Sequence, residues 1–428
     1  MRGLRRWLVI LTLIAVCVGG GVFWYSHKHP SDPYKAAAYR IARPYRFSIP
    51  RWETKALLSE ASERILTEVP DLNTPEAHDL VIDYLAVARE IGGLEGEIER
   101  LAAESGDDPS TQARIQELQE EVDRLRLLQK ERRPVVERIL EKQVSTILAE
   151  EHLGWLGKDW PPIAFQFTEP PYYFILSPRD RIVLRVGIHL KPQLSLKTRE
   201  DLENRAEREL PNTSALVEGI GGFSTWPTMI IDRASLEWVL STIAHEWTHT
   251  YLIAFPLGRH YYDSPDVSAI NETVADLVGN EVGHKALKRF YPEKVPPTPT
   301  PTPVHTQIRP LPTPTPQPTP TFDFTREMRI TREHVDELLA QGKVEEAEAY
   351  MEERRRFFLK HGYYIRKLNQ AYFAFHGTYR TGPAAPKEDP IGPRLRKLRE
   401  ESPTLRDFLR AVRDITSLDD LLRLVPEP

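Results

Sequence analysis

The sequence predicts a mostly helical α+β protein with a small mixed sheet, preceded by an N-terminal transmembrane helix and a helical hairpin. Apolar residues recur at helical spacing over residues 75–152, and again on both sides of residue 255. Short runs rich in β-branched and aromatic residues lie between residues 161 and 231. An uncharged stretch of residues 7–25 begins the chain. These patterns divide the sequence into an N-terminal anchor, a helical arm and a core that contains both helices and strands.

The composition excludes several classes of protein. The 428 residues are 40% hydrophobic and 28% charged, which argues against a polytopic membrane protein and against a wholly disordered chain. The formal net charge of −5 provides no basic surface, so we expect no nucleic-acid partner. The single cysteine, Cys17, excludes an intrachain disulfide and a cysteine-based zinc cluster.

Residues 1–27 are expected to form a cytoplasmic tail and a transmembrane anchor. Residues 7–25 match the length that a helix needs to cross a bilayer, and Trp7, Trp24 and Tyr25 lie at its ends, where aromatic rings favour the interface. The alternative is a cleaved signal peptide. We therefore expect a single-pass protein of the cell membrane that contacts the lipid bilayer through residues 7–25 and lies mainly outside the cytoplasm.

Two segments follow the anchor. Residues 28–74 are basic, contain scattered prolines and suggest a membrane-proximal connector. Residues 75–152 are expected to form a helical hairpin that turns at residues 104–110, with Asp108 as a cap. The hairpin is either a partner-binding arm or a helical subdomain packed on its neighbour. Its first helix carries a coiled-coil stripe of Val87, Ile91, Leu94, Ile98 and Leu101.

Residues 153–294 are expected to form the core of the molecule. Three short β-rich runs predict a small sheet: Ile163–Phe167, Tyr172–Leu176 and Arg181–Ile188. A polar helix follows around residues 198–210. A glycine-rich turn then leads into a run that contains Pro227, and proline within a strand predicts that the strand lies at a sheet edge.

Two histidines lie one turn apart on the next predicted helix. His245 and His249 are at positions i and i+4, so both imidazoles can reach one tetrahedral zinc ion. Glu246 flanks that position and can take a proton from water activated there. Asp232 is expected to cap the start of this helix. The helix is predicted from a stripe of Leu236, Val239, Leu240, Ile243, Trp247 and Tyr251.

A second amphipathic helix is predicted to begin at Ser264, with Pro265 at its first position. Glu272 and Asp276 lie one turn apart on this helix. Glu272 can supply a third, carboxylate ligand. Asp276 can accept a hydrogen bond from a ligand histidine and so fix its orientation. The sequence thus predicts one bound Zn²⁺ per chain.

The two motifs, HEWTH and NETVAD, resemble the gluzincin metallopeptidases, the thermolysin-like and aminopeptidase-like clan. The resemblance implies a zincin-type pair of active-site helices. It makes His245, His249 and Glu272 zinc ligands, Glu246 the general base and Asp276 the carboxylate behind the ligands. The clan also has an edge strand that pairs with substrate. GGFSTWPTMII occupies that place here but lacks the glutamate that binds the substrate amine in the aminopeptidase branch.

Residues 295–322 are expected to form a linker or insertion, since residues 296–321 hold 11 prolines and 8 threonines. Residues 323–428 are expected to be a helical part of the same enzyme. The run Asn369–Tyr372 resembles a helix of a bacterial family of predicted aminopeptidases. Candidates for stabilising an oxyanion are Tyr379 and His376, with Tyr261 and Tyr262 behind them.

These features predict a membrane-anchored zinc metallopeptidase that acts on peptides or proteins, as an aminopeptidase or an endopeptidase. The main alternative is a membrane-tethered scaffold with a vestigial metal site, in which the helical hairpin binds a protein partner. A general base at Glu246 argues against that alternative, because a purely structural zinc site has no use for one. A zinc hydrolase acting on a non-peptide substrate is the third possibility.

Overall fold

A computed structural model describes residues 32–54, 56–57, 67–105, 109–154, 161–295, 322–386 and 389–427. The expected anchor at residues 7–25 and most of the proline- and threonine-rich segment lie outside these ranges. Among the described helices, none combines the length and the apolar character needed to cross a bilayer. The described chain is mostly helical and contains a small mixed sheet, which agrees with the predicted α+β class.

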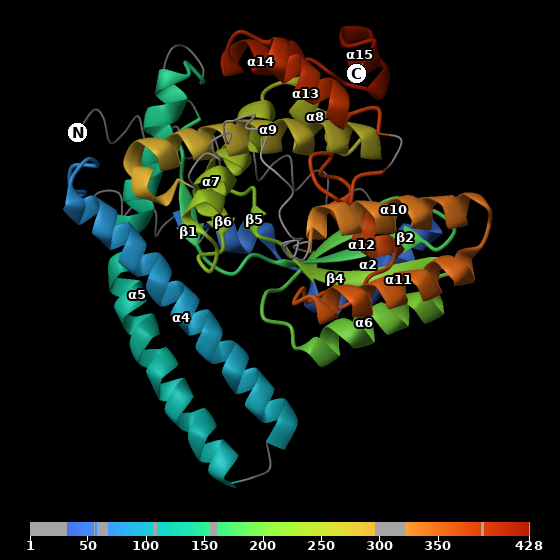
Figure 1. Cartoon of the computed structure of the whole chain (residues 1–428), viewed down its shortest axis with the longest axis horizontal. Coiled ribbons are helices and arrows are strands. Elements are labelled where there is room, and N and C mark those ends of the chain that lie inside the picture. Colours follow the sequence, from blue (N-terminus) through green and yellow to red (C-terminus); the bar gives the residue numbers. More distant parts are fainter. Residues whose placement is uncertain are drawn as a thin grey trace, which may run out of the picture.

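The three longest described helices are α4 (Pro75–Ser105), α5 (Pro109–Glu150) and α9 (Pro265–Phe290). The other helices before residue 295 are α2 (Pro33–Ala42), α6 (Leu196–Glu209), α7 (Leu236–Leu252) and α8 (Pro256–Arg259). Those after it are α10 (Phe324–Ala340), α11 (Val344–Lys360), α12 (Gln370–His376), α13 (Gly392–Glu401), α14 (Leu405–Val412) and α15 (Leu418–Leu424). The last three helices pack on α9, at the end of the molecule that carries the C-terminus (Figure 1).

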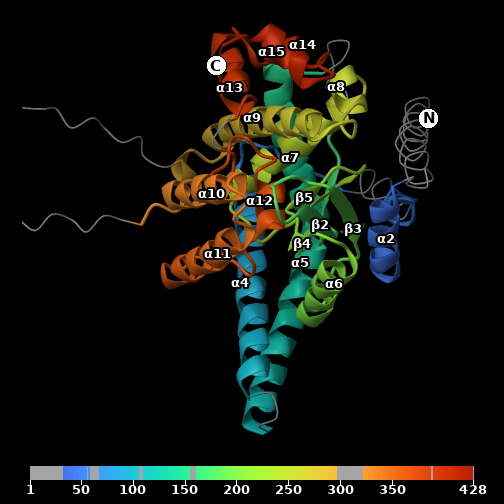
Figure 2. The same cartoon turned by 90° about the vertical axis from the view of Figure 1, so that its right-hand side faces the viewer.

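The larger of the two three-stranded sheets is antiparallel. Its strands are β2 (Tyr172–Pro178), β3 (Val186–Leu190) and β4 (Thr213–Gly219), in the order β3-β2-β4. The expected run from Arg181 becomes a strand only at Val186. One face buries alternating apolar residues such as Phe174 and Val217 against α2 and α6. Helix α12 packs on this sheet, and Figure 2 shows α2 and α11 on opposite sides of the strands.

The smaller sheet corrects the prediction for the proline-containing run. It consists of β1 (Phe165–Phe167), β5 (Gly222–Phe223) and β6 (Thr228–Ile230), in the order β1-β6-β5. Pro227 lies in the turn just before β6 and is not part of the strand. Strand β6 takes the central position, with β1 parallel on one side and β5 antiparallel on the other. The proline lacks an N–H but stands outside the ladder, and β5 forms the sheet edge instead.

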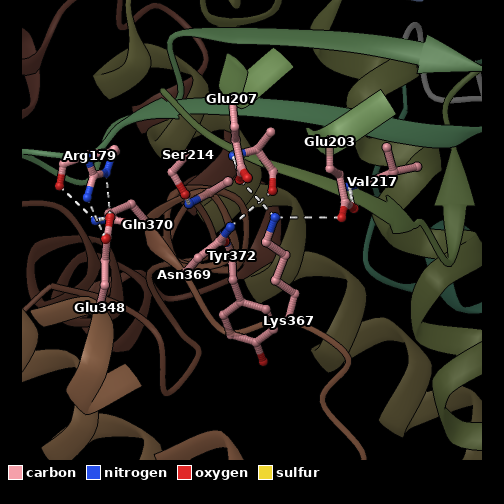
Figure 3. Close-up of polar contacts among 12 residues, drawn as sticks. Arg179, Glu203, Glu207, Ser214, Val217, Glu348, Lys367, Asn369, Gln370 and Tyr372 are labelled. Atoms are coloured by element: carbon pink, nitrogen blue, oxygen red, sulfur yellow. Dashed lines mark hydrogen bonds and ion pairs between the residues drawn. The ribbon is translucent and has the colours of Figure 1, made fainter. Parts of the chain in front are cut away.

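The outer edge of β4 is covered by side chains rather than by another strand. Glu203 and Glu207 of α6 accept the N–H groups of Val217 and Ala215, while Arg366 and Asn369 donate to the two carbonyls. Gln370 reaches back to Arg179 and Glu348 (Figure 3). These contacts satisfy the backbone donors and acceptors at the edge of β4, and they hold the start of α12 against the sheet.

Helices α4 and α5 form the predicted antiparallel hairpin, which projects from the body in both views (Figures 1 and 2). Their far halves meet through Ile91, Val122 and Leu125. The near half of α5 enters the main core, where Glu137 and Glu141 accept the backbone N–H groups of Phe167 and Phe165. The hairpin is thus bonded directly to β1.

Candidate metal centre

Helix α7 carries the two histidines. Its predicted apolar stripe is buried in the main core, which turns His245 and His249 toward α9. The cap is Ser235, whose hydroxyl accepts the Trp238 N–H, and not Asp232 as expected. Asp232 lies three residues further back and accepts hydrogen bonds from Tyr84 and Gln129 instead.

Helix α9 begins as predicted, with Ser264 as its cap. It packs closely on α7 because small residues face that helix. A Cβ added at Gly279 would come within 2.7 Å of the Ser241 carbonyl oxygen and 2.9 Å of the His245 Cβ. This close approach brings Glu272 and Asp276 next to the histidines.

Three donor atoms converge between the two helices. The Nε2 atoms of His245 and His249 lie 3.0 Å apart, and each lies 3.5 Å from Oε2 of Glu272. Two ligands at 2.0–2.1 Å from a tetrahedral zinc ion are separated by about 3.3 Å. His245, His249 and Glu272 could therefore hold one metal ion together.

The outer nitrogen of each imidazole is fixed by an acceptor on α9. His245 Nδ1 lies 3.1 Å from Asp276 Oδ1, and His249 Nδ1 lies 2.7 Å from Asn271 Oδ1. When each Nδ1 donates its proton, each Nε2 directs a lone pair toward the same point. Two lone pairs and a carboxylate repel one another unless a cation lies among them, so the donor set fits a metal ion.

The charged groups of the site shift the pKa values of His245, His249 and Glu272. Burial lowers the pKa of His245, but its hydrogen bonds to Asp276 and Glu272 outweigh burial and raise the pKa well above its usual range. For His249, burial is likewise outweighed by the Glu272 charge, and the pKa rises. Burial opposes ionisation of Glu272, yet the two histidines hold its pKa far below its usual value. Metal binding must therefore displace protons from the histidines.

Glu246 lies beside the triad and against the edge strand. Its side chain is 6% exposed, and a Cβ added at Gly222 of β5 would overlap with its Oε1. Glycine at this position therefore leaves room for the carboxylate. Burial raises the pKa of Glu246, while the nearby histidines lower it and leave the net shift upward. A carboxylate with a raised pKa suits a group that takes up and returns a proton.

Two tyrosines approach the triad from different segments. The Tyr261 hydroxyl, in the connection between α7 and α9, donates to Glu272 Oε1, the oxygen turned away from the histidines. The Tyr379 ring lies 6.3 Å from that of His245. Burial and the charges of Glu272, Asp276 and Glu246 raise the pKa of Tyr379. Both phenols therefore keep their protons at neutral pH.

The other two oxyanion candidates lie in different surroundings. The ring of His376 contacts Tyr372 and Phe375 within α12, at 4.2 and 5.0 Å, and burial lowers its pKa to about 4. Tyr262 is 64% exposed and packs edge-on against Tyr261. His376 is thus packed among the aromatic rings of its own helix.

Sequence reasoning missed two contributors to the site, Asn271 and Thr381, and expected Tyr261 only behind the oxyanion candidates. Asn271 holds His249 and is itself held by the Leu257 carbonyl oxygen. Thr381 donates to Asp276 Oδ2 at 2.7 Å, which ties the Tyr379 segment to the carboxylate behind His245. Tyr261 holds Glu272. Asn271 could have been found from its place in NETVAD, whereas Thr381 is about 100 residues away and carries no local signal.

Comparisons with known protein families, with curated proteins and with solved structures find no match to this chain. The assignment of a metal centre rests on the side chains of α7 and α9 alone.

Proposed function

We propose that this protein is a membrane-anchored, zinc-dependent metallopeptidase. The observation that supports the proposal most is the convergence of His245, His249 and Glu272, with Glu246 next to them on the same helix. Two imidazoles and one carboxylate form a common ligand set of catalytic zinc sites, which leave a coordination position open. Bound zinc would supply Lewis-acid activation of water and of the scissile carbonyl group.

Glu246 acts as the general base. Its buried carboxylate takes the proton of the attacking water and then passes it to the leaving amine. The upward shift of its pKa favours both transfers at neutral pH, because a strongly acidic carboxylate would be a poor proton acceptor. Asp276 and Asn271 keep the two imidazoles in the orientation that ligation requires.

Tyr379 stabilises the negative charge that develops on the carbonyl oxygen. Its pKa is raised, so its phenol is protonated and can donate a hydrogen bond. Tyr261 is committed to Glu272 Oε1 and serves to orient that carboxylate. Strand β5 lies at the edge of its sheet in the described part of the chain, directly beside Glu246, and an extended peptide would add to this edge.

The proposal is tested with the full-length protein in detergent. We expect one zinc per chain by metal analysis, hydrolysis of a peptide library read by mass spectrometry, and loss of hydrolysis on chelation. Glu246→Gln should retain the metal and lower turnover by at least 10³-fold, roughly the range of general-base catalysis. Glu237→Gln, an exposed substitution on the same helix, is the matched control.

Two results would overturn the proposal. A Glu246→Gln protein that hydrolyses peptides as fast as its parent would refute the assignment of the base. A zinc-loaded protein that hydrolyses no peptide would favour the scaffold alternative, or a hydrolase of non-peptide substrates.

The membrane anchor is a separate part of the proposal. Residues 7–25 should keep the full chain in membranes washed with alkaline carbonate. A protease added to intact cells should cleave the chain if its larger part lies outside the cytoplasm. Recovery of the chain in the carbonate wash would contradict a retained anchor and favour a cleaved signal peptide. The hairpin remains a proposed binding element for a protein partner.

A further inference from the structure

A row of polar side chains crosses one face of the antiparallel sheet. Tyr173 of β2 is paired in register with His189 of β3 on one side and with Glu218 of β4 on the other. Because side chains alternate along a strand, the next row on this face is Ile175, Gly187 and Leu216. Ile175 and Leu216 are buried under α12. Tyr173 packs against this apolar cluster, so the polar row borders the apolar part of the face.

This row is linked to the metal centre from two directions. His189 contacts the ring of Phe223 in β5, with the centroids 4.3 Å apart, and the adjacent Gly222 abuts Glu246. On the other side Tyr173 contacts Phe375 at 5.7 Å, and Phe375 contacts Tyr379 at 6.2 Å. Aromatic contacts therefore connect the row both to the strand beside the proposed base, Glu246, and to the proposed oxyanion donor, Tyr379.

The position of Tyr173 depends on a glycine. A Cβ added at Gly187 would overlap with the Tyr173 hydroxyl, so the phenol lies across β3 where a larger residue would exclude it. Charge interactions with Tyr173 contribute to the raised pKa values of both Tyr261 and Tyr379. Tyr173 is linked to Tyr379 through the Phe375 ring, which contacts both.

Glu218 is the acidic member of the row. Burial is the main cause of its raised pKa, and Arg366 and Arg199 only partly offset it. Arg366 is committed to Glu203 and to the Val217 carbonyl oxygen, while Arg199 lies over Tyr172, a residue of the opposite face. Burial also lowers the pKa of His189 to about 4, so His189 is neutral at pH 7 and adds no cation to the row.

We propose that Glu218, with Tyr173 beside it, forms a subsite for a positively charged group of the peptide substrate. A carboxylate near aromatic rings is a suitable environment for an ammonium or guanidinium group. Glu218 and His189 are two strand spacings apart, or about 10 Å. The subsite therefore selects a charge at a fixed position away from the cleaved bond. This inference rests on the proposed peptidase function.

The test is cleavage of a random decapeptide library by the full-length zinc-loaded protein, read by mass spectrometry. We expect lysine, arginine or a free N-terminus to be enriched at least fivefold at one fixed position away from the cleaved bond. Glu218→Gln should abolish the enrichment, and Glu218→Lys should replace it by enrichment of aspartate and glutamate. Glu200→Gln, an exposed substitution on α6, should change nothing. An N-acetylated copy of the library distinguishes an N-terminal ammonium from a side chain, because only the former preference is lost.

A parallel binding measurement separates this inference from the proposed function. Peptides retained by Glu246→Gln protein are compared with those retained by the Glu246→Gln, Glu218→Gln double variant. Preferential retention of cationic peptides that requires Glu218 supports the subsite even if the parent hydrolyses nothing. Equal retention of cationic and neutral peptides, or unchanged preference after Glu218→Gln in a variant with normal zinc content, would overturn it.

Discussion

Each of the three candidate ligand side chains is held by a hydrogen bond on the side away from the proposed ion. Asp276 and Asn271 hold the two imidazoles, and Tyr261 holds Glu272. These bonds restrict rotation of the rings and of the carboxylate before any metal binds. Ligands fixed in this way lose little side-chain entropy on binding, which strengthens the affinity for the metal.

A different buried carboxylate provides a prediction about pH. Glu53 is 6% exposed, accepts a hydrogen bond from the Trp226 backbone, and has one oxygen, Oε1, without a hydrogen-bond partner among the described residues. Burial raises its pKa from 4.5 to about 7. The folded state therefore keeps a proton that the unfolded state has lost, and stability falls as pH rises from 4.5 to 7.

We expect Glu53→Gln to remove this loss. The amide carries no charge and can still accept the Trp226 N–H. At pH 8 the variant should be more stable than its parent by about 1–2 kcal/mol, allowing for solvent screening, and near pH 4.5 the two should be equal. Thermal unfolding from pH 4.5 to 8 measures the difference, with the exposed Glu68→Gln as a control. A difference that does not change with pH would show that Glu53 is not the titrating group.

The pair of helices α7 and α9 is the structural element on which the metal centre depends. Gly279 and Gly283 both face Ser241 of α7, where a side chain would overlap with the backbone. The closeness of the two helices is set by these glycines and sealed by buried residues such as Val239 and Val278. The distance between the histidines and Glu272 is a direct consequence of this packing.

Gly279→Ala should therefore weaken both the fold and the site. The new methyl group must push α9 away from Ser241 and His245, which should cost about 1–3 kcal/mol of stability. Zinc affinity should fall as Glu272 moves away from the histidines. Gly93→Ala on α4 is the matched control, because a methyl group there meets no atom within 4 Å and should stabilise its helix by up to about 1 kcal/mol. Denaturant unfolding and zinc titration test both variants, and unchanged zinc affinity in Gly279→Ala would contradict the packing argument.

Elements whose signals are local could be predicted from the sequence. The cap and first residues of α9 are one such local signal, and the apolar stripe of α7 is another. They predicted both helices correctly. The order of strands could not be predicted, because β6 becomes central only by pairing with β1, about 60 residues earlier. The same holds at the site: the triad follows from two local motifs, whereas Thr381 and the polar row on the sheet depend on long-range packing.

On the scale of the whole molecule, segments from both ends of the described chain meet around the metal centre. The backbone of residues 45–47 bonds to β3 next to His189, and Phe47 contacts Phe223 of β5. Arg332 of α10 donates to the Phe373 and Ala384 carbonyls and so holds the segment that carries Tyr379. Ordering of the site therefore requires that the described segments before residue 296 and after residue 321 fold together.

Removal of the metal should consequently destabilise the whole protein. An ion that binds only the folded state adds about 1.4 kcal/mol of stability for each tenfold excess over its dissociation constant. The unfolding temperature should fall on chelation and return when zinc is added. His245→Ala protein should unfold at a temperature that chelators do not change. Equal unfolding temperatures of the parent with and without zinc would mean that the triad holds no tightly bound ion.

Helix α5 also has a structural consequence. It has 42 residues, about 60 Å of helix, with Pro134 inside it, and its inner half is bonded through Glu137 and Glu141 to β1. From β1 the ladder runs through β6 to β5, the strand against Glu246. The arm and the strand beside Glu246 are therefore joined by one continuous set of hydrogen bonds.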